Sequence, residues 1–434
     1  MSGAVAAHAS YNGSGTQGLA VTNTLTGTAG SEIQSVFWNT NDTTKQLVYG
    51  SAFVEIPANA GSGTSLINTQ ITQVFDVNND IDALGDIVLR VTVSSDNAST
   101  VKTSPMDVIR LIDRVEVHVG TSIWQTMHGD DLLALAATEM SKGAFDDLAL
   151  QASGGVSSNG TYTNNGFDSA GKVQVLAADG GAITAFVPLK LYTKTLGPNL
   201  ENFAEQTESG YLMAAAPSQQ VKIKVFTNSG VGTNFVTTEF GSTENSATVS
   251  LSLFAKSQVM CSEERNAMNS MANGVPKRIK MSQHVNKDFS GAAVDVDCDA
   301  FSLYASHLLI TIKDTSGGGG MTSINEAKGE VELLLNSSTY SSKLPLGLLR
   351  MAGSSMGLYT NDYTINTTDQ GSHVVYVFPL ASRAYSGSSV PLNRFDNIRL
   401  KFTQLPYSSG KISVTCVGET TALYLNSVAS LAMY

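Results

Sequence analysis

Only a few stretches of this sequence have residue types and spacing that could support catalysis. Gly353-Ser354-Ser355-Met356-Gly357 fits Gly-x-Ser-x-Gly, the pattern that holds a nucleophilic serine on a strand-to-helix turn. The residues that follow, Leu358–Asn361, do not read as a helix, and no histidine and aspartate partners can be assigned. We therefore interpret the motif as a loop in a chain rich in serine and glycine.

Two glycine-rich stretches resemble nucleotide-binding motifs. Gly166–Val173 is close to a phosphate-binding loop, but Val173 stands where a serine or threonine would bind magnesium, and the stretch lies in a polar loop. Gly13–Gly18 matches a dinucleotide fingerprint but precedes any predicted strand. We therefore expect no cofactor and no catalytic residues, and predict that the protein is not an enzyme.

Three alternating carboxylates form the one weak candidate for a metal site. Asp295, Asp297 and Asp299 would share one face of a strand, and Ca²⁺ is bound by several oxygen ligands. A solvated face is the favoured interpretation. The six histidines are scattered, and no histidine, carboxylate and nucleophile can be grouped.

Composition limits the classes of protein to be considered. A chain of 434 residues is expected to hold two or three domains. Only 15% of its residues are charged, which suits a protein whose surface is largely covered by copies of itself. The net charge of −11 and the lack of a basic run argue against direct nucleic-acid binding.

Cysteine usage and hydropathy indicate how the chain folds. The three cysteines, Cys261, Cys298 and Cys416, are few and far apart, which argues against a disulfide framework and a zinc site and favours a reducing compartment. No run of about twenty apolar residues predicts a membrane span. The N-terminus lacks the pattern of a secretory signal.

The clearest structural element is Ile109–Met140. Alternating apolar residues over Leu111–Val119 predict a strand with one buried face, and Gly120-Thr121-Ser122 predicts a turn into a return strand over Ile123–Met127. Gly129-Asp130-Asp131 predicts a helix start, because carboxylates favour the positive end of the helix dipole. We expect Leu132, Leu135, Ala136 and Met140 to share one face of this helix and Gly143 to end it.

The same pattern occurs a second time. Val331–Tyr340 repeats the hairpin pattern of Val115–Trp124. Further on, the order of segments is also repeated: Phe378-Pro379-Leu380 follows the pattern of Val187-Pro188-Leu189, and Ile398–Phe402 follows that of Val221–Val225. A repeat of domain size predicts two similar all-β domains.

The order of predicted elements gives the domain boundaries. We expect a flexible N-terminal arm over residues 1–35, a first β domain over 36–260, a linker helix over 261–275 and a second β domain over 276–434. Each domain has about eight short strands. The predicted fold class is therefore all-β, with two consecutive eight-stranded sandwiches or jelly rolls and short helices in the loops and linker.

Several stretches, in the same order, resemble the double jelly-roll major capsid proteins of large eukaryotic DNA viruses such as iridoviruses and phycodnaviruses. The resemblance covers roughly residues 70–430. It is carried by the following stretches: Val115–Leu133, Val187–Tyr192, Leu212–Lys224, Ser262–Arg265, Val375–Leu380, Ser386-Gly387-Ser388 and Asn393–Leu400.

This resemblance implies a structural protein of the virion. The expected assembly is a homotrimer whose six rolls form a pseudo-hexagonal capsomer of an icosahedral capsid, assembled in the host cell. The implied partners are neighbouring capsomers and the minor capsid and penton proteins, and an internal membrane beneath the shell is also compatible. The alternative is a secreted two-domain β-sandwich that binds glycans, which would need exposed aromatic side chains such as Trp38 and Trp124.

Overall fold

The computed structural model describes most of the predicted strands and some of the segments that connect them. The described residues are 33–34, 39–40, 49–60, 64–66, 70–77, 83–95, 109, 111–145, 148, 182–189, 212–213, 220–227, 247–260, 277–314, 329–361, 374–382, 384, 389–405, 407, 409–425 and 428–432.

The first roll consists of two antiparallel sheets formed between residues 49 and 260. Sheet 1A has the strand order β10-β7-β13-β3, with β11 and β5 paired beside it, and sheet 1B has the order β4-β6-β12-β8-β9. The strands of sheet 1A are β3 (Tyr49–Ile56), β5 (Thr64–Leu66), β7 (Ala83–Ser95), β10 (Ala182–Leu189), β11 (Leu212–Met213) and β13 (Ala247–Met260). Those of sheet 1B are β4 (Ala58–Ala60), β6 (Thr72–Asp76), β8 (Ile112–Val119), β9 (Ser122–His128) and β12 (Val221–Thr227).

The second roll consists of two further antiparallel sheets between residues 277 and 432. Sheet 2A has the order β14-β22-β16-β19, with β20 and β23 paired beside it, and sheet 2B has the order β15-β21-β17-β18. The strands of sheet 2A are β14 (Lys277–Ser290), β16 (Tyr304–Asp314), β19 (Tyr376–Pro379), β20 (Val390–Pro391), β22 (Ser409–Leu425) and β23 (Val428–Ala432). Those of sheet 2B are β15 (Val294–Asp297), β17 (Glu330–Leu335), β18 (Ser338–Pro345) and β21 (Ile398–Thr403).

The two rolls have the same connectivity. Taken in chain order, the strands β3, β7, β10 and β13 of sheet 1A occupy the places of β14, β16, β19 and β22 in sheet 2A. The strands β6, β8, β9 and β12 of sheet 1B likewise match β15, β17, β18 and β21 of sheet 2B. The duplication predicted from sequence is therefore confirmed, as is the prediction of two consecutive jelly rolls.

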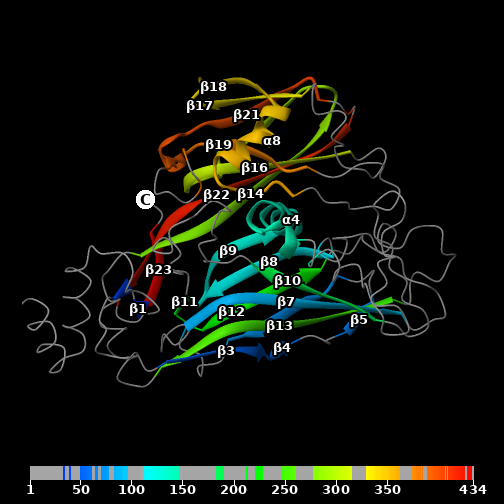
Figure 1. The fold of residues 1–434 in the computed structure, drawn as a ribbon, viewed down its shortest axis with the longest axis vertical. Helices are drawn as coiled ribbons and strands as arrows, with labels where there is room; N and C mark the ends of the chain where they lie inside the picture. The colour runs from blue at the N-terminus through cyan, green and yellow to red at the C-terminus, as the bar shows by residue number, and fades with distance from the viewer. Residues whose placement is uncertain are drawn as a thin grey trace, which may run out of the picture.

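Alternating side chains create one buried face on each strand. In β12, Val221, Ile223 and Val225 are buried, whereas Lys222 and Lys224 between them are not. A period of two on a pleated strand directs such residues to one side, which packs against the facing sheet. Figure 1 shows the result as layers, with the second roll above, the first roll below and one helix between them.

Each roll places a helix directly after the second strand of its hairpin. Helix α4 (Gly129–Glu139) follows β9, and helix α8 (Leu346–Ser355) follows β18. A short 3₁₀ helix, η5 (Leu392–Arg394), precedes β21. The hairpin turns use left-handed backbone conformations, with φ of 63° at Gly120 in the first and 49° and 64° at Asn336 and Ser337 in the second. The predicted Gly120 turn is confirmed.

Several predictions about individual elements were wrong. Helix α4 ends at Glu139, before Gly143, and it is buried on all sides. The Gly353–Gly357 motif is the end of α8 rather than a loop, because the apolar residues Leu346, Leu349 and Gly353 pack this segment as a helix. The two predicted strands over 411–425 are one strand, β22. Helix α8 was not predicted, and the return strand of the predicted second hairpin, β18, continues beyond Tyr340 to Pro345.

Some predictions lie outside the described residues. These are the linker helix at 261–275 and nearly all of the N-terminal arm, within whose span only Ile33–Gln34 is described, as a strand β1 paired with β2 (Asn39–Thr40). Within the described part of the chain, no helix has the length and apolar character needed to cross a membrane.

At Gly129, the first residue of α4, the helix lies very close to the backbone at the start of the hairpin. A Cβ atom at Gly129 would lie 2.3 Å from the carbonyl oxygen of Ile112 and 3.3 Å from that of Ile109. We expect Gly129→Ala to lower the free energy of unfolding by about 1–3 kcal/mol, because backbone must shift to accept the methyl group. Thermal unfolding measures the loss. Gly143→Ala, where a Cβ meets nothing within 4 Å, is the control and should change stability by less than about 0.5 kcal/mol.

Candidate functional site: the contact between the two rolls

Helix α4 belongs to the first roll but is enclosed by both. Every residue from Asp131 to Glu139 is buried, including the unbroken apolar run Leu132–Ala137. A helix that is apolar on all sides needs partners on all sides. The first roll covers one side through β8 and β9, and β16 of the second roll covers another (Figure 1).

The N-terminal end of α4 is bonded to three strands of sheet 2A. Asp131 Oδ1 accepts hydrogen bonds from Nδ1 of His284 on β14, at 2.7 Å, and from the hydroxyl of Thr415 on β22. Asp130 pairs with Lys313 on β16 and accepts a 3.2 Å bond from Ser413 Oγ on β22. Because these side chains come from β14, β22 and β16, the helix lies across one face of the sheet.

Asp131 also caps the N-terminal end of its own helix. Its Oδ2 atom accepts a 2.8 Å hydrogen bond from the backbone N–H of His128. This is one half of a capping box, which satisfies a backbone donor that the first helical turn leaves free. One carboxylate therefore fixes both the start of the helix and its position on the second roll.

The C-terminal end of α4 is capped by the segment that follows α8. The backbone N–H groups of Tyr359 and Asn361 donate to the carbonyl oxygens of Thr138 and Ala137, at 2.8 and 3.1 Å. The Asn361 side-chain amide donates to the Met140 carbonyl at 2.8 Å. The last carbonyls of a helix have no partner within it, so these bonds satisfy them with groups of the second roll.

A buried ion pair joins the rolls near this end. Lys280 on β14 pairs with Glu139 at the end of α4, and their side chains are 3% and 0% exposed. Such a pair is stable only if both charges are present, because either alone would be buried without its partner.

The helix start also perturbs two ionisable groups. Burial opposes ionisation of Asp130, but the positive charge of Lys313 and its hydrogen bond outweigh it, and the pKa of the carboxyl is lowered. Burial, assisted by the charge of His284, lowers the pKa of His128. The two imidazole rings lie 4.4 Å apart, one on each roll.

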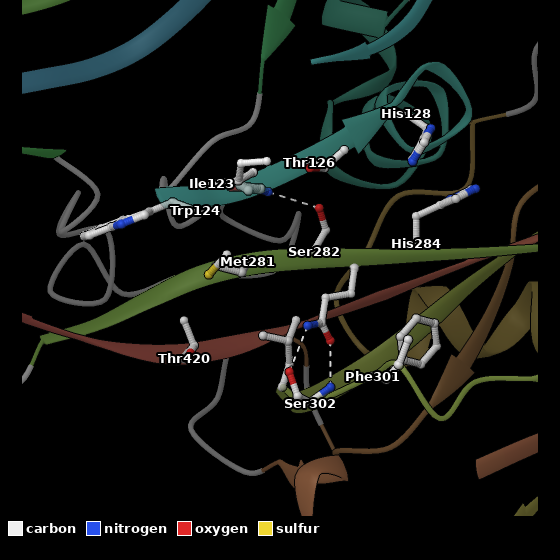
Figure 2. Close-up of a pocket in the computed structure, with 14 residues that line it drawn as sticks. Ile123, Trp124, Thr126, His128, Met281, Ser282, His284, Phe301, Ser302 and Thr420 are labelled. Carbon is white, nitrogen blue, oxygen red and sulfur yellow. Dashed lines mark hydrogen bonds between the residues drawn. The ribbon is translucent and has the colours of Figure 1, made fainter. Parts of the chain in front are cut away.

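A small cavity of about 260 Å³ lies where β9 passes β14. Figure 2 shows the two strands side by side, with His128 and His284 at one end of the cavity. Gln125 Nε2 donates to Ser282 Oγ across it at 3.1 Å. Its wall combines amide and hydroxyl groups with Trp124, Met281 and Phe301, and these groups join the rolls rather than form a set of nucleophile, base and acid.

The structure places the sequence-predicted site residues away from this junction. Asp295 and Asp297 lie on the exposed side of β15, and Asp299 Oδ1 accepts a 2.6 Å hydrogen bond from the backbone of Ile398. Over the described ranges, no three acidic, histidine or cysteine side chains are grouped as for a metal ion. Ser355 lies at the end of α8 and donates to the Ala352 carbonyl.

The other features noted in the sequence are the two glycine-rich stretches and the cysteines. The glycine-rich stretches at 13–18 and 166–173 lie outside the described residues. Cys298 and Cys416 are buried free thiols, and burial raises the pKa of Cys298 to about 12. Such thiols stay protonated and act as small apolar side chains.

Sequence reasoning missed the inter-roll contact. The sequence placed Asp130 and Asp131 at the start of a helix, where carboxylates favour the positive end of the helix dipole, but did not indicate that they bond to the second roll. One signal was present: the apolar run Leu132–Ala137 is too long for a helix with a single buried face. Lys280 and Glu139 gave no signal, because each reads as an exposed residue in its own segment.

Comparison with known proteins identifies the fold. No protein-family model matches the sequence, and no curated protein matches it. Among solved structures, VP54 of PBCV-1 is 12% identical, with a TM-score of 0.63 over 91% of this chain and 98% of VP54. The Faustovirus major capsid protein is 10% identical, with a TM-score of 0.58 over 88% of this chain and 92% of that protein.

A third similar structure comes from the Sputnik virophage. It is 9% identical, with a TM-score of 0.51 over 90% of each chain. In all three, nearly the whole of both chains is matched, so the likeness includes both rolls. The chain therefore has the double jelly-roll fold found in viral major capsid proteins, as the sequence resemblance implied.

Proposed function

We propose that this protein is a major capsid protein that builds the shell of an icosahedral virion. The observation that carries the proposal is the pair of like-connected rolls, matched over nearly their full length by VP54 of PBCV-1 and the Faustovirus major capsid protein. Its activity is self-assembly, and no catalytic step is assigned to it.

The proposed assembly unit is a homotrimer. Helix α4, bonded at both ends to the second roll, makes the two rolls one rigid block. Three such blocks around a three-fold axis give six rolls, a pseudo-hexagonal tile whose sides can repeat across a surface. Contacts of this head-to-tail kind form a closed ring when the rotation between copies is right.

The division of the chain follows from the same proposal. Residues 36–260 form the first roll, residues 276–434 the second, and residues 261–275 connect them, while residues 1–35 form an arm at the base of the tile. The partners are neighbouring capsomers and the minor capsid and penton proteins, with an internal membrane compatible beneath the shell. The net charge of −11 supports an arrangement without direct nucleic-acid contact.

The alternative of a secreted glycan-binding sandwich finds no support in the comparisons. Its binding surface would need exposed aromatic rings, but Trp124 is only 3% exposed and packs in the junction. Trp38 lies outside the described residues.

The mass of the purified protein in solution tests the proposal. We expect light scattering to give about three times the 45.7 kDa of one chain, and negative-stain images to show pseudo-hexagonal particles. A stable monomer at every concentration would contradict the proposal.

A further inference from the structure

The cavity between β9 and β14 has walls from both rolls. The first roll contributes Ile123–Thr126 and His128, and the second contributes Met281–His284 and the segment Ala300–Leu303 that leads into β16. Ile123 is 52% exposed, so the cavity opens to solvent beside it. A molecule in the cavity would therefore touch both rolls at once.

The cavity is large enough for a small ring compound. Its volume is about 260 Å³. In another protein, an apolar cavity of about 150 Å³ is large enough to bind benzene. The space between the rolls can therefore hold a ring of that size together with a polar substituent.

One buried polar atom in the wall has no partner. Gln125 is 3% exposed, and its Nε2 atom donates to Ser282 Oγ at 3.1 Å. Its Oε1 atom is buried and has no hydrogen-bond partner within the part of the chain that the structure describes. Because an acceptor in this state costs stability, the site favours a molecule that brings an N–H or O–H donor.

Ser282 offers the complementary group beside it. The Ser282 oxygen accepts the bond from Gln125, and its hydroxyl proton can still be donated, because a hydroxyl is at once a donor and an acceptor. An acceptor on β9 and a donor on β14 thus lie next to each other. Together they match the N–H and C=O groups of an amide.

Neighbouring polar groups of the wall are bonded within the protein. Gln283 Nε2 donates to Ser302 Oγ at 2.9 Å, and Gln283 Oε1 accepts from the Ser302 backbone at 2.8 Å. Both ring nitrogens of His284 have partners, Asp131 at 2.7 Å and Asn286 at 3.3 Å. Recognition of a ligand therefore rests on the acceptor and donor pair described above.

The rest of the wall favours an uncharged ligand. Trp124, Met281 and Phe301 line the cavity with ring and thioether surfaces. Among its described lining residues there is no aspartate, glutamate, lysine or arginine. His128, whose pKa is lowered by burial, is neutral at pH 7. A charged ligand would lose its hydration here without gaining an opposite charge.

We propose that this cavity binds a small uncharged ring compound with an amide group, such as an aromatic carboxamide or a lactam. The ligand N–H donates to Gln125 Oε1, its carbonyl accepts from the Ser282 hydroxyl, and its ring packs on Trp124. Figure 2 shows the Gln125–Ser282 hydrogen bond between Trp124 at one end and the two histidines at the other. The proposal goes beyond the capsid function and does not depend on it.

A ligand of this class fits the cavity better than water does. Water can bond to the polar pair, but it gains nothing from the rings and thioether on the remaining wall. A ring with an amide group satisfies both parts of the wall. Because it binds only where the two rolls are packed together, at ten times its Kd it should raise the melting temperature by about 1–3 °C.

Benzamide is the probe that tests the proposal. In a titration of the full-length protein at neutral pH, followed by saturation-transfer NMR, we expect saturable binding with a Kd of about 1 mM or lower. Acetophenone has a methyl group in place of the amide NH₂ and leaves Gln125 Oε1 without a donor. It should bind about tenfold or more weakly, as should the charged benzoate.

The variant Gln125→Met removes the acceptor and keeps the length of the side chain. Its affinity for benzamide should fall about tenfold or more, so that benzamide no longer binds better than acetophenone. A general disturbance of the cavity would weaken both ligands alike, so the ratio of the two affinities reports on the acceptor. Thr126→Val, which removes another lining hydroxyl on the same strand, is the matched control and should keep the wild-type ratio.

A density map of the wild-type protein with benzamide gives a test that needs no variant. We expect the amide beside Gln125 and Ser282 and the ring against Trp124. A map that shows only ordered water in the cavity would overturn the proposal. Equal binding of benzamide and acetophenone to the wild type, or a preference for benzamide that survives in Gln125→Met, would overturn it too.

Discussion

Replacing Lys280 by methionine is expected to lower the free energy of unfolding by about 3–5 kcal/mol. The Glu139 side chain is 0% exposed and pairs with Lys280, so the variant would leave a buried carboxylate without its cation. The pair joins β14 to α4, so the loss falls on the contact between the rolls. Calorimetry should show it as a lower melting temperature or as two separate transitions.

The double variant Lys280→Met with Glu139→Leu isolates the cause. Removing both charges removes the cost of burying them, so we expect stability within about 1–2 kcal/mol of the wild type, or above it. A double variant as unstable as the single one would contradict this explanation. Lys313→Met is the comparison and should lower the stability less than Lys280→Met does. Lys313 and Asp130 are 21% and 19% exposed, so water can replace part of their interaction.

The architecture of each roll could be predicted from local sequence patterns. Alternation over Leu111–Val119 and the turn at Gly120 depend on neighbouring residues, and both are seen in the structure. The repeat at Val331–Tyr340 was visible because both hairpins have an alternating strand, a tight turn and a return strand in the same order. Patterns of this kind are local, and local patterns survive in a single sequence.

The contact between the rolls could not be predicted in the same way. Lys280 lies 141 residues from Glu139, and nothing in either segment indicates the other. On an alternating strand, Lys280 reads as a solvent-exposed residue, and Glu139 reads as the polar end of a helix. Their burial results from the packing of one roll on the other, which a window of sequence does not contain.

Helix α8 was missed for a different reason. Its sequence, Leu346–Ser355, contains two glycines and two serines, no acidic residue in its first turn and no basic residue in its last. The usual signals of a helix are therefore weak, and the Gly353–Gly357 pattern at its end is also typical of a serine- and glycine-rich loop. The comparison of the two hairpins was the better guide, because α4 follows the first at the same place.

His307 is expected to make the second roll sensitive to acid. Its side chain is fully buried on β16, and burial lowers its pKa to about 3. The negative charge of Glu139 raises this pKa and the positive charge of Lys280 lowers it, but burial has the largest effect. The unfolded chain takes up a proton near pH 6.5 and the folded chain does not. Stability is therefore complete above that pH and falls as the pH drops toward 3.

The expected loss between pH 7 and pH 5 is about 2 kcal/mol, which follows from a slope near 1.4 kcal/mol per pH unit below 6.5. Urea unfolding at the two pH values measures it.

In His307→Gln, which does not titrate, this difference in stability between pH 7 and pH 5 should shrink by most of that amount. Ile310→Val on the same strand is the control for lost packing: it should be destabilised by about 1 kcal/mol at both pH values and keep the wild-type pH dependence. An unchanged pH dependence in His307→Gln would mean that other groups cause the acid sensitivity, with His128, whose pKa is also lowered by burial, the next to test.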